Sequence, residues 1–451
     1  MDWMALLSRH CIAPLAARKD GSAHLRAARE YEETQRWPPE RLYSYRWRRL
    51  QEMLAFAYAN STFYQRRFRL AGLRPEEVRR PEDLAALPRL TKRDLQEYRD
   101  QIMVPAAAGR AHVEKRTSGS TGTPLRVLVD KAGMERKLAS TIRHNRWAGY
   151  DIGDAVGLIW GDIESPRRLR SRLRRLLLDR YQVLDSQRIS VQAMERFAEA
   201  LRRRRIRCLV GQAQPLYLFA EFVRERGMRD LPVRSVIPTG LMLYEKQRRL
   251  IEDALCCEVF NRYGAEETSI ISSECEAHRG LHINAEGLWL EIVRGETEAA
   301  PGEEGELLVT DLVNRAMPLL RYEIGDVVVP SAEACPCGRT LPLLERVSGR
   351  VADCITSPDG FVVSGIAITD HVTAIPGVGQ MQVVQDLPDH LWFRIVMTAE
   401  WGPGSARLLG QLVGRIFGPR MRFDCEFVPE IAPDLAGKWR FSISRVKARL
   451  G

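Results

Sequence analysis

The spacing of apolar residues changes along the chain and predicts where helices give way to strands. From residue 42 onward the first apolar positions recur at helical spacing and lie on one face: Trp47, Leu50, Leu54 and Ala57. Residues 1–40 are polar and charged, and we expect them to be irregular or loosely docked. We therefore predict that residues 1–100 form a helical lead-in that carries no chemistry of its own.

Between residues 131 and 237 predicted helices alternate with short apolar runs. The helices are expected at 131–148, 190–204 and 214–226, and the strands at 155–160, 206–210 and 233–237. This alternation is typical of an α/β layer fold with parallel strands. Because ligands of such sheets bind at the carboxyl ends of the strands, we expect binding residues within 237–240 and 260–264.

From Gly287 the apolar period becomes two, with Leu288, Leu290 and Ile292 on one face, and predicts a β-rich subdomain over 287–348. Beyond 349–353 the pattern changes again. Strands are expected at 381–384, 391–397 and 421–428, and an amphipathic helix at 408–417. We predict a large N-terminal domain (1–348), a hinge (349–353) and a small α+β domain (354–451) that is long enough to fold alone.

Composition narrows the classes of function. The 451 residues suggest two to three domains, and the formal net charge of +10 is carried mostly by arginine. Such a charge suits anionic ligands, but no nucleic-acid reader motif accompanies it, so we expect no nucleic-acid partner. The arginine-rich stretch 166–180 has an apolar stripe. It is either a surface helix with a solvated basic side or a contact for an anionic membrane surface or acidic partner.

The chain shows no sign of export or membrane insertion. No run approaches the ~18 apolar residues of a spanning helix, and Arg9 and His10 interrupt the apolar start. Nine cysteines form no disulfide framework. We therefore expect a cytoplasmic protein with reduced thiols.

One polar loop has a composition suited to phosphate. It consists of Thr117, Ser118, Gly119, Ser120, Thr121, Gly122 and Thr123, and Pro124 closes it. Glycines let backbone N–H groups approach an oxyanion, and hydroxyls add donors. The loop is not a Walker A motif, because no Gly-Lys-Ser/Thr ends it and a strand-like run follows. The alternative is an ordinary polar turn.

Three further polar clusters follow the loop at domain-scale spacing. They are 263–267 (Tyr-Gly-Ala-Glu-Glu), 321–326 (Arg-Tyr-Glu-Ile-Gly-Asp) and 437–440 (Gly-Lys-Trp-Arg). Together the four motifs, with 349–353 between the last two, resemble the adenylate-forming enzymes, in particular their phenylacetate–CoA ligase and capsule-biosynthesis (CapK-like) branch. The resemblance covers nearly the whole chain, including Leu-Pro-Arg-Leu-Thr-Lys at 87–92.

The resemblance implies an enzyme that joins a carboxylate to the α-phosphate of ATP, releases pyrophosphate and passes the acyl group to a thiol such as CoA. Both reacting groups are anionic, so catalysis is positioning and charge neutralisation. The 117–123 loop would hold the β- and γ-phosphates, and Glu267 would hold Mg²⁺, which prefers oxygen ligands. Lys438 would stabilise charge between the carboxylate and the α-phosphate.

The remaining roles also come from the resemblance. Tyr263 and Gly264 would line the nucleotide and acyl site, and Asp326 would accept hydrogen bonds from the ribose hydroxyls. Thr239 and Gly240 would lie along adenine. Arg350 and Asp353 belong to the hinge segment, with Asp353 as the residue about which the small domain rotates. Bland interpretations stay open for some of these residues. Glu267 could be a glutamate at a helix start, Asp326 a turn residue, Lys438 a surface lysine, and Arg350 and Asp353 polar linker residues.

Two departures from the family pattern concern the substrate. Leu241 follows Thr239-Gly240, where this branch more often has a glutamate, and Gln-Ala-Gln-Pro at 212–215 differs from the usual small residues. Both would tune the acyl pocket, so phenylacetate is not assumed.

A second site is expected at Cys275, His282, Cys335 and Cys337. Thiolate and imidazole are the ligands Zn²⁺ prefers, and four of them close a structural tetrahedron. Relatives of this branch look similar here. His278 competes with His282 as the fourth ligand, and reduced, uncoordinated cysteines are the alternative.

Two other functions stay open at this point. One is transfer of the acyl group to an amine, which gives an amide. The other is a non-catalytic relative that binds a nucleotide, against which the presence of Lys438, Glu267 and Asp326 argues. The sequence identifies neither the acid nor whether the chain acts as a monomer or a homodimer.

Overall fold

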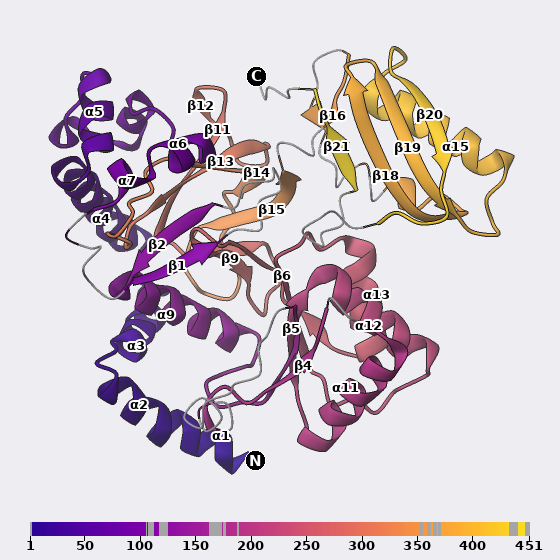
Figure 1. Ribbon diagram of the computed structural model, residues 1–451, viewed down its shortest axis with the longest axis horizontal. Coiled ribbons are helices and arrows are strands. Elements are labelled where there is room, and N and C mark those ends of the chain that lie inside the picture. Colours follow the sequence, from indigo (N-terminus) through magenta and orange to yellow (C-terminus); the bar gives the residue numbers. More distant parts are fainter. Residues whose placement is uncertain are drawn as a thin grey trace. The chain divides into compact units, whose positions relative to one another are not determined.

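The computed structural model describes residues 2–104, 106, 112–116, 125–161, 174, 177–186, 189–350, 355–358, 362–363, 368, 371–432 and 441–446 (Figure 1). The chain forms two compact units. The first comprises Met1–Leu290, Val309–Tyr322 and Ser331–Leu344, and the second Glu291–Leu308, Glu323–Pro330 and Glu345–Gly451. The predicted boundaries at 348 and 354 remain a prediction. Among the described helices, none is both long and apolar enough to cross a membrane.

The first unit begins with helices, and the prediction that residues 1–40 are irregular is wrong. The elements are α1 (Trp3–Leu7), a π-helical turn (Ser8–Ile12), α2 (Ala13–Lys19), α3 (His24–Thr34), α4 (Pro39–Asn60), α5 (Thr62–Leu70), α6 (Lys92–Glu97) and α7 (Arg99–Ile102). The polar residues of α3 misled the prediction because their partners are distant in sequence. Glu30 pairs with Arg136 (2.7 Å) and Glu32 with Arg146 (3.1 Å).

One expectation for the lead-in is confirmed, and a helix cap adds to it. Leu50, Leu54 and Ala57 of α4 are buried on one face, as their spacing predicts. The backbone N–H of Asp94 donates to the Thr91 hydroxyl (3.1 Å), and the Asp94 carboxylate accepts from the Thr91 N–H (2.8 Å). This reciprocal cap fixes the start of α6.

A two-stranded antiparallel hairpin precedes the parallel sheet. Its strands are β1 (His112–Arg116) and β2 (Arg126–Asp130), with Arg116 opposite Arg126. Helix α9 (Lys131–Trp147) follows β2 directly, and the Asp130 side chain caps it by accepting from Gly133 N–H (2.6 Å). The hairpin and α9 are therefore one continuous piece of structure.

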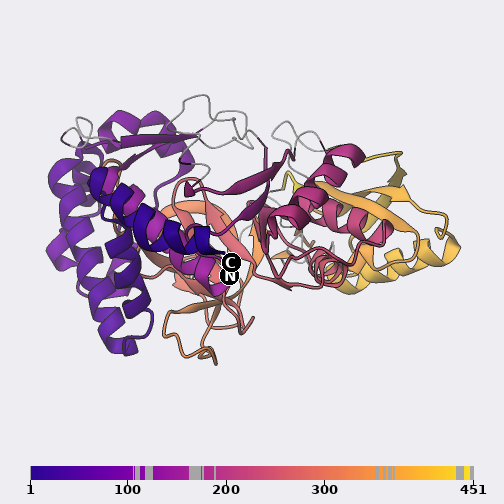
Figure 2. The ribbon, with the colours of Figure 1, turned by 90° about the horizontal axis from the view of Figure 1, so that it is seen from below.

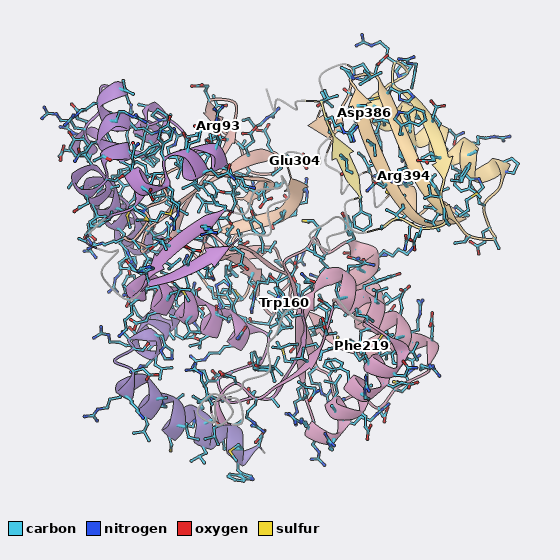
Figure 3. The ribbon with its side chains drawn as sticks, in the orientation of Figure 1. Arg93, Trp160, Phe219, Glu304, Asp386 and Arg394 are labelled. Carbon is cyan, nitrogen blue, oxygen red and sulfur yellow. The ribbon has the colours of Figure 1, made fainter. Side chains whose placement is uncertain are left out.

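The predicted parallel sheet is confirmed, with order β4-β3-β5-β6-β7. Its strands are β3 (Val156–Ile159), β4 (Tyr181–Leu184), β5 (Cys208–Gln212), β6 (Ser235–Thr239) and β7 (Glu258–Val259). Helices α11 (Val191–Arg204), α12 (Ala213–Glu225) and α13 (Glu245–Leu255) lie on the same side of it (Figures 1 and 2). Apolar side chains such as Phe197 bury the contact. Phe219, labelled in Figure 3, is another of them.

The β-rich part begins earlier than predicted, at residue 262. An eight-stranded sheet has the order β12-β11-β13-β14-β15-β10-β9-β8. Its strands are β8 (Arg262–Ala265), β9 (Ser269–Glu274), β10 (Leu281–Ile283), β11 (Leu288–Arg294), β12 (Thr297–Glu298), β13 (Gly305–Asp311), β14 (Tyr322–Ser331) and β15 (Leu343–Arg350). The predicted alternation over 288–292 is only partly right, since Leu288 and Trp289 are both buried and Leu290 is less so.

The C-terminal part of the second unit has the predicted α+β pattern. Strands β18 (Val378–Leu387) and β19 (His390–Met397) form a hairpin, and β20 (Arg422–Phe427) and β21 (Ser442–Ser444) flank them in parallel, in the order β20-β19-β18-β21. Helix α15 (Pro403–Phe417) buries Leu409, Val413 and Phe417 in the same core. A small pair, β16 (Ile355–Thr356) and β17 (Val362–Val363), completes it.

Candidate functional site

The predicted phosphate-binding residues 117–123 lie outside the described residues. The strands on either side of them, β1 and β2, are paired along their whole length. The chain therefore enters and leaves this segment at two neighbouring positions, Arg116 and Arg126.

Glu267 lies in a tight turn between β8 and β9, which we call the Glu267 turn (residues 266–268). It is not at the start of a helix, the bland interpretation for this residue. Tyr263 and Gly264 lie in β8, not at the end of a parallel strand as predicted. A side chain at Gly264 would place its Cβ 2.6 Å from the Ser269 carbonyl oxygen, so only glycine fits this close pairing.

The Glu267 side chain is half-buried, and one of its carboxylate oxygens is engaged by a described residue. The Tyr322 hydroxyl, at the start of β14, donates to Glu267 Oε1 (3.2 Å). The neighbouring Glu266 is exposed, and its carboxylate lies 3.9 Å from the Lys115 ammonium on β1. Lys115 stands two residues before Thr117, so this contact brings the hairpin and the Glu267 turn together.

Two residues at this turn escaped the sequence reasoning. The Lys137 ammonium on α9 donates to the Glu267 carbonyl oxygen (2.9 Å) and lies 3.6 Å from Asp311 Oδ2. Both side chains are buried. Two features of the sequence could have indicated these residues. Lys137 lies on a helical face whose other residues pack inward, and Asp311 lies at the end of an apolar strand.

The carboxyl edge of the parallel sheet gathers the residues expected near adenine. Gln212 and Thr239 end β5 and β6 and stand opposite each other in register. Gly240 has a left-handed backbone (φ 73°), and a Cβ there would lie 3.3 Å from the Trp160 ring, which follows β3 (Figure 3). Gln212 accepts a hydrogen bond from Ser186 (3.3 Å). Trp160 lines this edge and was missed by the sequence reasoning, although it is the last residue of a predicted strand.

The other predicted site residues are distributed as follows. Asp326 is buried within β14 and belongs to the second unit. Arg350 ends β15, where only its backbone is described. Asp353 and Lys438 lie outside the described residues, as does most of 166–180. Arg174, from that stretch, pairs with Asp179 (3.1 Å).

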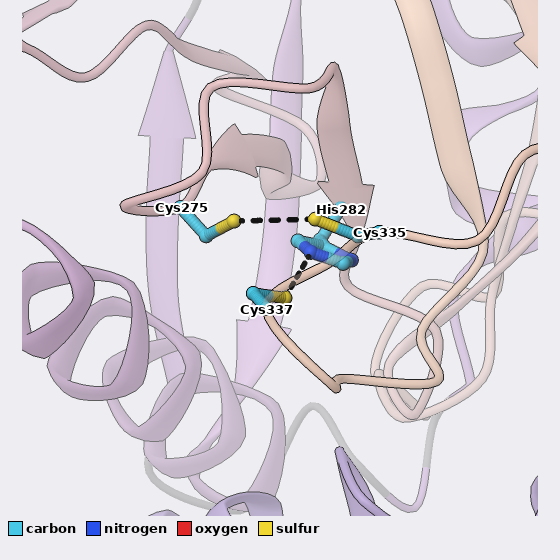
Figure 4. Close-up of side chains that lie close together, drawn as sticks. All are labelled: Cys275, His282, Cys335 and Cys337. Carbon is cyan, nitrogen blue, oxygen red and sulfur yellow. Dashed lines mark hydrogen bonds between the residues drawn. The ribbon is translucent and has the colours of Figure 1, made fainter.

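Four residues converge in the first unit and form what we call the Cys/His cluster: Cys275, His282, Cys335 and Cys337 (Figure 4). Their ligand atoms all lie within 4.8 Å of one another. Cys275 Sγ is 3.6 Å from Cys335 Sγ, and His282 Nε2 is 3.3 Å from Cys337 Sγ. The predicted set is thus brought together across some sixty residues of sequence.

The chemistry of the cluster suits a metal ion. His282 Nδ1 lies 3.2 Å from the Leu341 carbonyl oxygen, an acceptor only, so Nδ1 carries the proton and Nε2 turns its lone pair toward the cysteines. Burial lowers the pKa of His282 to about 4, which keeps the imidazole neutral. Burial raises the pKa of the Cys275 thiol to about 12. A cation is the group that would reverse this effect and allow thiolates here.

His278, the competing ligand, is not part of the cluster. Its Nδ1 lies 3.3 Å from the Glu274 carboxylate, and its ring packs on Phe260 (4.8 Å between ring centroids). Of the two histidines, the structure brings His282 to the cysteines.

Neighbouring side chains and a backbone N–H group hold the cluster in place. The Arg339 N–H donates to Cys337 Sγ (3.4 Å), and the Arg339 guanidinium pairs with Glu276 (2.8 Å) and lies over the Trp147 ring (4.8 Å to its centroid). Trp147 packs edge-on against His282 (5.4 Å between centroids). Such outer partners orient ligands and are typical of metal sites.

A fully buried ion pair lies near these neighbouring side chains. The Arg143 guanidinium binds the Glu286 carboxylate at 2.5 and 3.0 Å, and Thr34 Oγ1 donates to the same carboxylate (2.5 Å). Burial alone would raise the pKa of Glu286, but the positive charge of Arg143 holds it below its ordinary value. The pair joins α3, α9 and the turn after β10.

Comparison with known proteins identifies relatives of this chain. A phenylacetate–coenzyme A ligase from Thermus thermophilus is 29% identical over 341 residues, 70% of this chain and 72% of that protein. Protein CapK from Staphylococcus aureus is 23% identical over 413 residues, 88% of each chain. A family model, the CapK C-terminal domain, matches residues 355–445, within the predicted small domain.

A solved structure shares the fold. The crystal structure of 2-hydroxyisobutyryl-CoA ligase in the postadenylation state, in complex with R3-HIB-AMP, matches with a TM-score of 0.73. The match covers 92% of this chain and 91% of that chain at 19% identity, and so concerns the fold alone. The chain is therefore a relative of the phenylacetate–CoA ligases and of CapK, with the fold of an adenylate-forming ligase and a CapK C-terminal domain at residues 355–445.

Proposed function

We propose that the protein is an ATP-dependent ligase that activates a carboxylic acid as its acyl-adenylate and then transfers the acyl group to a thiol, most simply CoA. The observation that carries the proposal is the meeting of the β1–β2 hairpin with the Glu267 turn through Lys115 and Glu266. This contact supports the proposal, because Lys115 precedes the predicted triphosphate loop and Glu266 adjoins the predicted magnesium ligand. The ligase relatives support the same reaction.

The described residues divide the work of binding and charge neutralisation. Glu267 has one carboxylate oxygen engaged by Tyr322, and we assign the other, Oε2, to Mg²⁺, a hard cation that prefers oxygen. The ion, when bound, would neutralise the phosphates. The residues that we place along the nucleotide are Thr239, Gly240, Tyr263, Gly264 and Asp326, and we keep the 117–123 loop for the departing pyrophosphate.

Lys438 is proposed as the residue that stabilises charge between the attacking carboxylate oxygen and the α-phosphate. A preorganised cation at that point acts most strongly in the transition state, where the two anionic groups approach. Arg350 and Asp353 are proposed as hinge residues that let one site perform two steps in succession.

For the Cys/His cluster we propose one structural Zn²⁺. Three sulfurs and one imidazole nitrogen match the ligands of a closed tetrahedral site, which leaves no position for substrate. The ion would fasten the 275–282 turn to the 335–337 loop and take no part in adenylation. We also place the protein in the cytoplasm, where its cysteine thiols stay reduced.

The proposal is tested by ATP–pyrophosphate exchange with a panel of aromatic and aliphatic acids. We expect exchange that depends on one class of acid, and CoA thioester by mass spectrometry when CoA is added. Exchange without thioester, together with amide when amines are supplied, would replace the acceptor by an amine. Absence of exchange with every acid, in protein that still binds ATP, would leave the nucleotide-binding alternative.

The same preparation settles two remaining points. Sedimentation distinguishes a monomer from a homodimer. Flotation with anionic vesicles tests the basic stretch 166–180, and failure to float would assign that stretch to a solvated surface.

A further inference from the structure

We propose that Lys137 is a positioning residue for the magnesium–ATP site: it holds the Glu267 turn against the base of the β1–β2 hairpin, and Asp311 anchors its ammonium group there. The inference rests on the proposed function. None of the motifs that point to the function contains Lys137 or Asp311.

The Lys137 ammonium is engaged by two protein groups. It is buried, donates to the Glu267 carbonyl oxygen at 2.9 Å and faces Asp311 Oδ2 at 3.6 Å. A buried ammonium needs both a hydrogen-bond acceptor and a counter-charge, and these two groups supply them. Its carbonyl partner belongs to the residue that we assign to Mg²⁺.

Asp311 is itself fixed by the backbone. Its Oδ1 accepts from the N–H groups of Val313 (2.9 Å) and Asn314 (3.0 Å). Its Oδ2 has no hydrogen-bond partner within 3.5 Å among the described residues, so Lys137 is the cation that this oxygen faces. The carboxylate thus occupies one orientation and directs its charge at Lys137.

The loop that follows Asp311 also binds the hairpin. Asn314 Nδ2 donates to the Leu128 carbonyl (2.8 Å), and the Arg315 N–H donates to the Asp130 carboxylate (3.0 Å), which also caps α9. Helix α9 therefore starts from the hairpin at a fixed point and delivers Lys137 two turns later. The distance between the hairpin and the Glu267 turn is set by this rigid path.

Two readouts test the inference, and only one of them is activity. Mn²⁺, which stands in for Mg²⁺ and is visible by electron paramagnetic resonance, is titrated into protein saturated with a non-hydrolysable ATP analogue. The Mg²⁺ concentration for half-maximal ATP–pyrophosphate exchange is measured in parallel. For Lys137→Met we expect both metal constants, the Mn²⁺ dissociation constant and the Mg²⁺ concentration for half-maximal exchange, to rise about 10- to 100-fold. This is the range seen when an outer partner of a metal ligand is lost.

Three variants sharpen the test. Lys131→Met is the control on the same helix: the Lys131 ammonium also donates to a backbone carbonyl, that of Gly21 (2.8 Å), although Lys131, unlike Lys137, is exposed. We expect it to keep wild-type metal constants. Lys137→Arg, which restores a cationic donor, should recover part of the loss, and Asp311→Asn should weaken both constants less than Lys137→Met does.

The outcomes separate the inference from the function on which it rests. Wild-type exchange with unchanged metal constants in folded Lys137→Met overturns the role of Lys137 alone. If Lys137→Met does not fold, Asp311→Asn decides, and wild-type metal constants in that variant overturn the inference. Wild-type protein that catalyses no exchange with any acid overturns the proposed function instead.

Discussion

The Cys/His cluster and the Glu267 turn lie in the same unit but are built in opposite ways. In the cluster, three of the four side chains are buried, and their ligand atoms face one another within 4.8 Å. At the turn, Glu267 is half-buried and its carboxylate accepts from Tyr322 (3.2 Å), while the exposed Glu266 lies 3.9 Å from Lys115. The cluster brings four potential metal ligands together, whereas the hydrogen bond from Tyr322 engages one of the two carboxylate oxygens of Glu267.

The difference follows from what each site would have to do. A structural ion contributes to stability only if the protein supplies all of its ligands and excludes water. A magnesium ion that arrives with ATP takes most of its ligands from phosphate and water, so a protein needs to supply only one or two carboxylates. Changes in the cluster should therefore affect stability, and changes at the turn should affect catalysis.

The largest effect is expected for Cys335→Ser. Structural zinc contributes about 10 kcal/mol or more to the folding of small zinc domains, so loss of one buried ligand should remove the metal and unfold the first unit at much lower temperature. Elemental analysis should show about one zinc per chain in the wild type and almost none in the variant. Cys256→Ser, at an exposed thiol outside the cluster, should change neither value. Equal metal content in all three proteins would contradict the assignment.

Glu286→Gln should be the next largest change, again in stability. It leaves the Arg143 guanidinium buried without its counter-charge, which typically costs about 3–5 kcal/mol. Denaturant unfolding measures it, with the exposed Glu245→Gln as control, for which we expect a change below about 0.5 kcal/mol. A cost as small as that of the control would show that the pair contributes nothing to stability.

Because the pKa of Glu286 is shifted, the same experiment can also be carried out as a function of pH. Because its pKa in the folded protein lies below the ordinary carboxyl value of 4.5, its contribution is complete above that value and is lost as the pH falls through the lowered pKa. Wild-type stability should therefore decrease on acidification below pH 4.5, and Glu286→Gln should lack this component. Parallel curves for the two proteins would assign acid unfolding to other groups.

Lys438→Ala should leave stability unchanged and reduce acyl-adenylate formation about 10²- to 10³-fold, the usual cost of removing one transition-state donor. ATP binding, measured by calorimetry, should persist because the triphosphate contacts remain. Normal adenylation in this variant would remove Lys438 from the mechanism.

The smallest effect is expected for Tyr322→Phe. One hydrogen bond of 3.2 Å to Glu267 is lost and the ring stays, so the exchange rate should fall about two- to tenfold with little change in unfolding temperature. An effect as large as that of Lys438→Ala would assign Tyr322 a direct catalytic role.

Much of this arrangement could be predicted from the sequence, because local pattern carries it. Alternating helices and apolar runs predicted the parallel sheet, and the apolar runs at 381–384 and 391–397 predicted the strands of the β18–β19 hairpin. The cluster was also predictable, since Cys and His have few other reasons to recur at such spacing.

The misses have a common physical cause, which is pairing between residues far apart in the chain. Helix α3 looked irregular because its glutamates find their arginines a hundred residues later, on α9. Lys137 and Asp311 look like ordinary polar residues until α9 and β13 bring them together. No local sequence pattern predicts such pairs, so the position of the Glu267 turn could be found only from the structure.

The central claim is that the Glu267 turn serves catalysis, and it is tested most directly by acid-dependent ATP–pyrophosphate exchange in three proteins. The wild type should catalyse exchange. Glu267→Gln should lose it about 100-fold or more, as expected for a metal ligand. The adjacent Glu266→Gln should keep it within about fivefold, since a surface ion pair is worth about 0–1 kcal/mol. Equal exchange in all three proteins would contradict the account.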